Sequence, residues 1–116
     1  GLDDKIAEIA SSDAMKMATS EYKSFLEAPK NYFTINLATK NGMAAASEFI
    51  KTNNLNDNAY AFEFGKNRKS AKILYGVYAS IKEAKEAMRN LSSSVLESKP
   101  YIDNISKHQA LYSKYN

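Results

Sequence analysis

The side chains that could do chemistry in this chain fall at alternate positions of predicted strands. In the segment 32–38, apolar residues alternate with Thr34 and Asn36, and successive side chains of a strand point to opposite faces. If the apolar set faces a core, the outward side chains of this and two later strands form one candidate ligand-binding face: Tyr32, Thr34, Asn36, Lys72, Leu74, Tyr101 and Asp103. Aromatic rings stack on the apolar faces of sugars, while hydroxyls and amides exchange hydrogen bonds with sugar hydroxyls. These residue types therefore favour non-covalent binding of a polar, ring-containing ligand.

A basic loop adjoins this face in the predicted arrangement. The segment Gly65–Lys69 is predicted to be the tip of a hairpin and carries Lys66, Arg68 and Lys69. Such cations form ion pairs with carboxylates, so the loop is a candidate electrostatic rim for an acidic ligand. The alternative is a solvated hairpin that contacts no ligand.

Residue types needed for catalysis or metal binding are sparse. The chain has no cysteine and one histidine, His108, which falls in a polar segment and is expected on the surface. We find neither a metal-site spacing of histidines and carboxylates nor a glycine-rich phosphate loop. The sequence therefore predicts a protein that is not an enzyme and that uses no metal and no cofactor.

The elements that must position these residues follow a β-α-β-β-α-β order. The predicted strands and helices are strands over 32–38, 59–64, 71–79 and 101–105, and helices over 43–52 and 81–91. Ser80 and Glu83 have the spacing of a capping box at the start of the second helix. In this order the strands form one four-stranded antiparallel sheet with both helices on one face. The other face, which carries the candidate ligand-binding residues, is expected to be bare.

This order predicts an α+β fold of the ferredoxin-like or RNP-like βαββαβ sandwich class, preceded by a helical extension. Apolar residues recur at helical spacing over 2–27, and Pro29 ends this helix because the residue before a proline avoids helical geometry. We therefore expect an N-terminal extension over 1–31, one domain over 32–109 and a polar tail over 110–116. The aromatic residues assigned to the core are Tyr60, Phe62 and Phe64.

Length and charge limit the classes of partner. The 116 residues carry a formal charge of +3, which is too small by itself to indicate nucleic-acid binding. No apolar run approaches the roughly 20 residues of a membrane span. The chain starts at Gly1 without a signal-peptide pattern, so we expect a piece of a larger protein whose membrane anchor, if it has one, lies outside this sequence.

Three segments are similar to a known family. Phe33–Leu37, Tyr75–Ala87 and Lys99–Gln109 resemble parts of a SPOR domain, a sporulation-related repeat, of the kind found at the C-terminus of DamX-type proteins. The resemblance covers about residues 32–109, and its most specific part is the Gly-Val-Tyr-Ala-Ser run that begins at Gly76. It implies the fold described above and a non-enzymatic module that binds bacterial peptidoglycan, with a preference for glycan strands stripped of their stem peptides.

The resemblance also implies where such a module works and which residues it uses. It implies targeting of a larger cell-division or envelope protein to the septum or cell wall, in the periplasm, with glycan strands and cell-division or envelope proteins as partners. Asn36 stands at the family's first-strand glutamine, and Tyr101 stands at a tryptophan that begins the last strand. Gly76 and Tyr78 match the family's glycine and the aromatic residue two positions later.

There are two alternative interpretations of the same sequence. Ser70 and Ala71 stand where DamX-type domains have an aromatic residue, so the chain could be a SPOR scaffold that has lost glycan binding and serves protein–protein interaction. An RNA-recognition motif shares the βαββαβ order, but the segment Tyr75–Tyr78 lacks the required sequence of basic, glycine and aromatic residues. We therefore expect no nucleic-acid partner.

Overall fold

The computed structural model describes residues 20–116, and the part of the predicted first helix before Ser20 lies outside the described residues. The strands are β1 (Phe33–Lys40), β2 (Ala59–Phe64), β3 (Ser70–Tyr78) and β4 (Tyr101–Asn104). The helices are α2 (Ser20–Glu27), α3 (Met43–Thr52), α4 (Ile81–Arg89), α5 (Ser93–Leu96) and α6 (Ile105–Tyr115), with a 3-10 turn, η1 (Lys66–Arg68). The predicted β-α-β-β-α-β order is confirmed, and α5 and α6 are additional helices.

The four strands form one antiparallel sheet in the order β2-β3-β1-β4. This confirms the predicted α+β class, with α3 and α4 together on one face. β1 has a register shift against β3 between Asn36 and Ala38, and such an irregularity changes the alternation of side chains. Leu37 and Ala38 consequently both pack on the α3 side, and Thr39 returns to the opposite face, where it pairs with Lys72.

The joint between β3 and α4 is fixed by the predicted capping box. The amide of Glu83 donates to Ser80 Oγ at 3.2 Å. The carboxylate of Glu83 accepts from the amide of Ala79 at 3.0 Å, one residue earlier than the capping-box spacing predicts. Both interactions satisfy backbone amides at the helix start.

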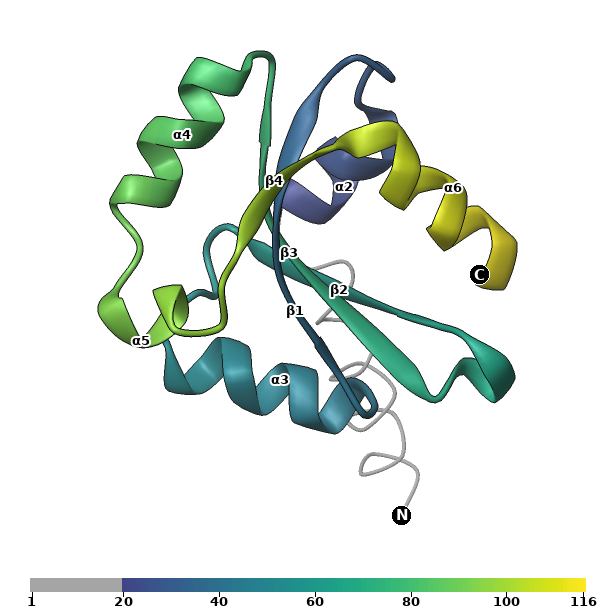
Figure 1. The fold of residues 1–116 in the computed structure, drawn as a ribbon. Coiled ribbons are helices and arrows are strands. Elements are labelled where there is room, and N and C mark those ends of the chain that lie inside the picture. Colours follow the sequence, from purple (N-terminus) through teal and green to yellow (C-terminus); the bar gives the residue numbers. More distant parts are fainter. Residues whose placement is uncertain (1–19) are drawn as a thin grey trace.

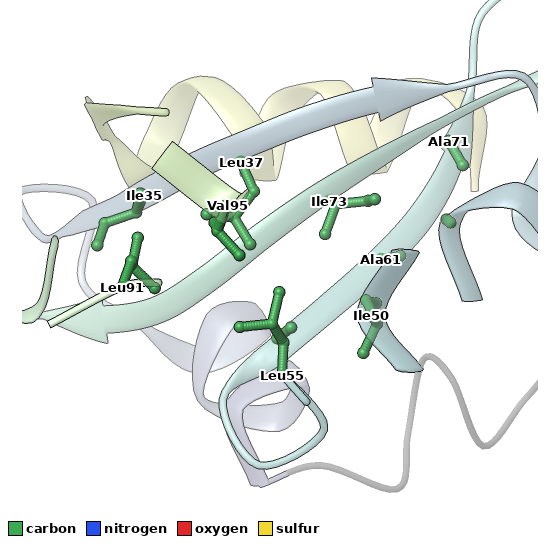
Figure 2. Packing of buried hydrophobic residues seen from close by; sticks show 11 residues of the cluster. Ile35, Leu37, Ile50, Leu55, Ala61, Ala71, Ile73, Leu91 and Val95 are labelled. Carbon is green, nitrogen blue, oxygen red and sulfur yellow. The ribbon is translucent and has the colours of Figure 1, made fainter. Parts of the chain in front are cut away.

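The first hydrophobic core lies between the sheet and α3, α4 and α5, and Figure 2 shows its buried side chains. Its larger residues are Ile35, Leu37, Ile50, Leu55, Ile73, Leu91 and Val95. β2 contributes only small side chains to it, namely Ala59 and Ala61. Burial of this apolar surface, at about 25 cal/mol per Å², is the main term that stabilises this layer.

The opposite face of the sheet is not bare, so that prediction is wrong. α2 and α6 pack over β2 and β3 on this face, while α3, α4 and α5 lie on the other side of the sheet (Figure 1). A second cluster of buried residues fills the layer, namely Tyr22, Phe25, Tyr60, Phe62, Leu74 and Ile105. The physical cause is the row of large rings on β2, which exposes too much apolar surface to remain in water.

Hydrogen bonds join the two covering helices to each other. The hydroxyl of Tyr22 donates to that of Tyr112 at 2.7 Å. Gln109 Nε2 donates to the carbonyls of Phe25 and Ala28, at 2.9 Å each. A side chain of α6 thereby satisfies carbonyls at the C-terminal end of α2, which have no partner within their own helix. α6 continues past residue 109, where the sequence suggests only a polar tail.

Candidate functional site

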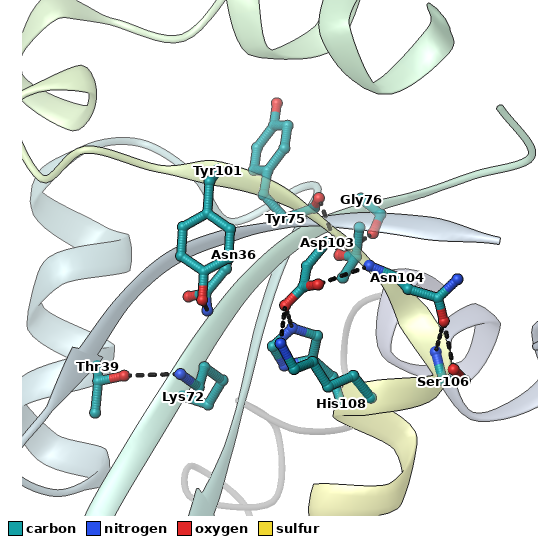
Figure 3. Close-up of polar contacts among 12 residues, drawn as sticks. Asn36, Thr39, Lys72, Tyr75, Gly76, Tyr101, Asp103, Asn104, Ser106 and His108 are labelled. Atoms are coloured by element: carbon teal, nitrogen blue, oxygen red, sulfur yellow. Dashed lines mark hydrogen bonds and ion pairs between the residues drawn. The ribbon is translucent and has the colours of Figure 1, made fainter. Parts of the chain in front are cut away.

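α2 and α6 leave part of the second sheet face accessible along β4 and β1, and the polar side chains there form a group that we call the polar strip. Its members are Asn36, Thr39, Lys72, Tyr101, Asp103, Lys107 and His108. Figure 3 shows that the side chains from β1, β3, β4 and α6 converge on one region. Four of these residues, Asn36, Lys72, Tyr101 and Asp103, belong to the face predicted from the alternation of the strands.

Tyr101 provides the exposed aromatic surface of the polar strip. It pairs with Asn36 across the two strands, and Asn36 Nδ2 donates a hydrogen bond to Tyr101 Oη at 2.7 Å. Tyr101 is 51% exposed, whereas Asn36 is buried. Within residues 20–116 no hydrogen bond engages Asn36 Oδ1. The pair therefore offers a ring of fixed orientation beside an amide oxygen that can still accept.

Lys72 places a cation near this pair. Its Nζ donates to Thr39 Oγ1 at 2.9 Å and lies 5.3 Å from the centroid of the Phe64 ring. Burial lowers the pKa of Lys72, the charge of Asp103 opposes this shift, and Lys107 adds to it. No carboxylate of the described residues forms an ion pair with Lys72. Its charge is therefore oriented by neutral partners and remains available to an anionic ligand.

Asp103 and His108 join β4 to α6. His108 Nε2 and Lys107 Nζ lie 2.9 Å and 3.7 Å from the same oxygen, Asp103 Oδ2. A carboxylate only accepts, so Nε2 carries the proton, and Nδ1 is buried without a hydrogen-bond partner. The prediction that His108 lies on the surface is wrong, because the segment after β4 is a helix that turns this ring onto the sheet.

We expect the protein to lose stability through His108 as the pH falls below about 6.5, the ordinary pKa of histidine. Burial lowers the pKa of His108, the hydrogen bond and charge of Asp103 oppose this, and Lys72 and Lys107 lower it further. The unfolded chain then binds more protons than the folded one, so the free energy of unfolding decreases as the pH falls. Urea unfolding at about pH 7.5 and about pH 5.5 measures this slope.

The matched variant for this experiment is His108→Gln, whose amide can still donate to Asp103 but does not titrate. It should show a smaller loss of stability at the lower pH than the unchanged protein. Burial raises the pKa of Glu21, which gives a slope of opposite sign, but this contribution is common to both proteins. Identical slopes in the two proteins would contradict the role assigned to His108.

Three predicted ligand-binding residues do not reach the polar strip. Thr34 and Leu74 lie on the expected face but are fully buried, so the prediction that they form an open surface is wrong. Leu74 belongs to the cluster beneath α2 and α6, and Tyr32 is half-buried and packs against the same cluster. The cause in each case is the cover supplied by the two helices.

Thr34 instead takes part in a buried polar contact. Its Oγ1 lies 2.8 Å from the Tyr60 hydroxyl, and the two oxygens lie 2.7 Å and 3.1 Å from the carbonyl of Gly76. Gly76 has φ +73°, and a Cβ built there would lie 2.1 Å from the Tyr78 hydroxyl. The position therefore favours glycine for backbone and packing reasons, and its carbonyl satisfies two buried hydroxyls.

The predicted basic rim lies at the turn between β2 and β3. Lys66 and Lys69 are exposed. Arg68 is already engaged, because its Nη2 lies 3.2 Å from Glu63 Oε1 and donates to Asn116 Oδ1 at 2.6 Å. Arg68 thus ties the turn to the end of the chain, and the two lysines are the rim cations most accessible to a ligand.

Sequence reasoning missed three members of the polar strip, namely Thr39, Lys107 and His108. Thr39 reaches this face through the register shift in β1, for which the sequence holds no local pattern. For Lys107 and His108, which lie in α6, the sequence does contain a pattern that predicts a helix. Asn104 caps this helix, its Oδ1 accepting from the amide of Ser106 at 3.1 Å, and asparagine is a preferred N-cap residue.

No protein-family model matches the chain, and a search of curated proteins gives no match to its sequence. Within residues 20–116, no group of three or more histidine or carboxylate side chains is placed to hold a metal ion. None of the helices in this part of the chain is long and apolar enough to cross a membrane. The chemistry that the polar strip offers is ring stacking, hydrogen bonding and attraction of charge at a surface.

Proposed function

We propose that this chain is a non-catalytic module that binds the glycan strands of peptidoglycan along the polar strip. The observation that carries the proposal is Tyr101, a half-exposed ring on an edge strand whose hydroxyl is held by a buried amide. Such a ring suits a carbohydrate-binding surface, because a sugar presents apolar C–H faces that stack on aromatic side chains. Immobilising the ring before the ligand arrives reduces the entropy that binding must overcome.

Hydrogen bonds and charge extend this contact along the strip. Asn36 Oδ1 is placed to accept from a sugar hydroxyl or an acetamido N–H next to the stacked ring. Lys72 and the rim residues Lys66 and Lys69 supply positive charge on the β3 side. Asp103, which already accepts from His108, offers carboxylate oxygens to further hydroxyls.

The positive charge also gives a reason for selecting stripped glycan strands. In intact peptidoglycan the lactyl carboxyl group of the muramyl sugar is an amide, because it carries the stem peptide. An amidase cleaves that amide and leaves a carboxylate, which the cations Lys72, Lys66 and Lys69 can attract. Removal of the peptide also clears space above the sheet, where α2 and α6 already narrow the accessible surface.

Pelleting with purified sacculi tests the proposal directly. We expect the 116-residue chain to sediment with sacculi, and the bound fraction to rise severalfold after amidase treatment, as the lactyl carboxylates appear. The amount should fall when salt increases from about 0.05 M to about 0.5 M, because exposed charges are screened. Failure to pellet with either preparation at low salt would overturn the proposal.

The proposed function also implies a location in the cell and a larger protein to which the chain belongs. A peptidoglycan-binding module works where the glycan lies, so the proposal places the chain in the periplasm, as part of a larger cell-division or envelope protein that it directs to the septum or cell wall. Its partners are then glycan strands and neighbouring envelope proteins.

A second candidate function is protein–protein interaction on the same scaffold without glycan binding. The observation that favours it is the cover of β2 and β3 by α2 and α6, which removes Leu74 and Tyr32 from the face that a glycan strand would contact. The sacculus experiment separates the two candidates, since only the first requires the chain to pellet.

A further inference from the structure

An apolar groove lies on the helical layer opposite the polar strip, between α4 and α5. Its volume is about 720 Å³, within the range of specific ligand sites. The residues that line it are Ile81, Lys82, Lys85, Met88, Arg89 and Leu96. The proposed glycan site does not use this surface, because α4 packs on the face of the sheet opposite the polar strip. Of the lining residues, only Met88 is among the apolar side chains that pack against the first core.

The groove exposes large apolar side chains that a folded domain usually covers. Ile81 is 47% exposed and Leu96 is 42% exposed, and Met88 between them is only partly buried. Only two other large apolar side chains of the described residues, Leu26 and Tyr101, are comparably exposed, and they lie elsewhere. Two such side chains gathered in one hollow mark an interaction surface more than isolated exposed residues do.

The charged side chains that line the groove are all basic. Lys82, Lys85 and Arg89 lie three and four positions apart, so they project from neighbouring turns of α4. Within residues 20–116 none of the three forms an ion pair or a hydrogen bond through its side chain. The carboxylate of Glu83 on the same helix is occupied by the helix cap. The groove thus combines an apolar floor with three unpaired cations.

We propose that this groove binds an acidic amphipathic helix of a protein partner. Such a helix presents apolar side chains at positions i, i+3, i+4 and i+7 that fill a hydrophobic groove. Its flanking carboxylates meet the three cations, which gives the contact its specificity and speeds association. A hollow bounded by two helices fits a rod-shaped segment better than the flat surface of an anionic bilayer, which would favour a convex apolar ridge.

The partner helix and the glycan strand are expected to bind independently. The groove is formed by α4 and α5, whereas Tyr101 and Asn36 lie on the other face of the sheet. A chain with both sites would link a second envelope protein to the cell wall. The proposal does not require the glycan site, because every residue of the groove belongs to a separate surface.

A synthetic peptide tests this inference with the full 116-residue chain. The probe is a fluorescent 14-residue helical peptide with leucines at i, i+3, i+4 and i+7 and glutamates on the flanks, and its control carries lysines in place of the glutamates. We expect fluorescence anisotropy to show at least about tenfold tighter binding of the glutamate peptide, because the lysine peptide meets like charges. Equal affinities for the two peptides, or no binding of the glutamate peptide, would overturn the inference.

Two variants locate the binding surface, and a third serves as the control. Lys85→Glu reverses one groove charge and Leu96→Ser removes one apolar contact, and each should weaken binding of the glutamate peptide at least about threefold. Lys51→Glu reverses an exposed charge on α3, outside the groove, and should leave the affinity unchanged. Equal weakening by Lys85→Glu and Lys51→Glu would show an effect of net charge alone and would contradict the assigned site.

Two further measurements exclude other occupants and separate this inference from the glycan proposal. Vesicles of phosphatidylglycerol should not compete with the peptide, and competition would identify a membrane surface as the occupant instead. Sedimentation of the chain alone should show no self-association, and association lost in Leu96→Ser would identify a second copy as the occupant. Lys85→Glu should still pellet with sacculi as the unchanged chain does, so either proposal can fail while the other holds.

Discussion

Replacing Phe25 with alanine is expected to lower the free energy of unfolding by about 3–5 kcal/mol, the range found for truncation of a buried aromatic ring. Phe25 has no exposed surface, and its ring centroid lies 5.1 Å from that of Tyr60, 5.8 Å from that of Phe62 and 6.2 Å from that of Tyr112. The rings of Tyr60 and Phe62 are fixed on β2, so the cavity cannot collapse fully. Urea unfolding followed by circular dichroism measures the change.

The neighbouring residue supplies the control for this experiment. Leu26 follows Phe25 in α2 but is 43% exposed, so Leu26→Ala should change the free energy of unfolding by only about 0.5 kcal/mol. Both substitutions introduce alanine into the same helix and change its helix propensity by similar small amounts. The difference between their effects on the free energy of unfolding therefore reports the packing of α2 on the sheet. Small and equal effects would show that α2 does not cover β2, and the face would again be open to a long ligand.

A signal for this covered face was present in the sequence of β2. The segment Ala59–Phe62 is apolar at every position rather than at alternate ones. A continuous apolar run is typical of a strand buried on both faces. Ala59 and Ala61 indeed lie in the first core, whereas Tyr60 and Phe62 lie in the second. The alternation in β1 holds from Thr34 to Leu37, but it describes that strand and not the whole sheet.

The cover from α6 was harder to predict because its buried side is partly polar. Gln109, Tyr112 and His108 face the sheet or α2, and each keeps a hydrogen-bond partner there. Amphipathic side chains of this kind bury an apolar body and still satisfy a polar tip. A count of apolar residues therefore describes this helix as a polar tail, although its packing closes the second layer.

Local signals explain what the sequence did predict. The start of α4 depends on Ser80 and Glu83, which are three residues apart, and the end of α2 depends on Pro29. Alternation likewise placed Asn36, Lys72, Tyr101 and Asp103 on one face, as the structure has them. Burial is different, since it depends on segments far apart in the chain. Alternation therefore assigned the face of each candidate residue, but not its accessibility.

Replacing Tyr101 with alanine is expected to reduce the affinity for amidase-treated sacculi at least about tenfold, or about 1.4 kcal/mol. The variant loses the exposed ring of the polar strip and leaves Asn36 Nδ2 without the oxygen it contacts at 2.7 Å. Tyr101→Phe keeps the stacking surface but loses the hydroxyl, so a smaller loss of about threefold is expected, of the size of one hydrogen bond. Pelleting over a range of protein concentrations measures both affinities.

A variant on the opposite helical layer shows whether this loss is specific. Ile81→Ala removes an exposed apolar side chain from α4, far from the polar strip in the fold, and should pellet as the unchanged chain does. Tyr101 is half exposed, so Tyr101→Ala should remain folded, which its circular dichroism spectrum would verify. A folded Tyr101→Ala protein that pellets as strongly as the Ile81→Ala protein would exclude the polar strip as the glycan site. If Tyr101→Phe lost as much affinity as Tyr101→Ala, the hydrogen bond to Asn36 rather than ring stacking would be the main source of binding energy.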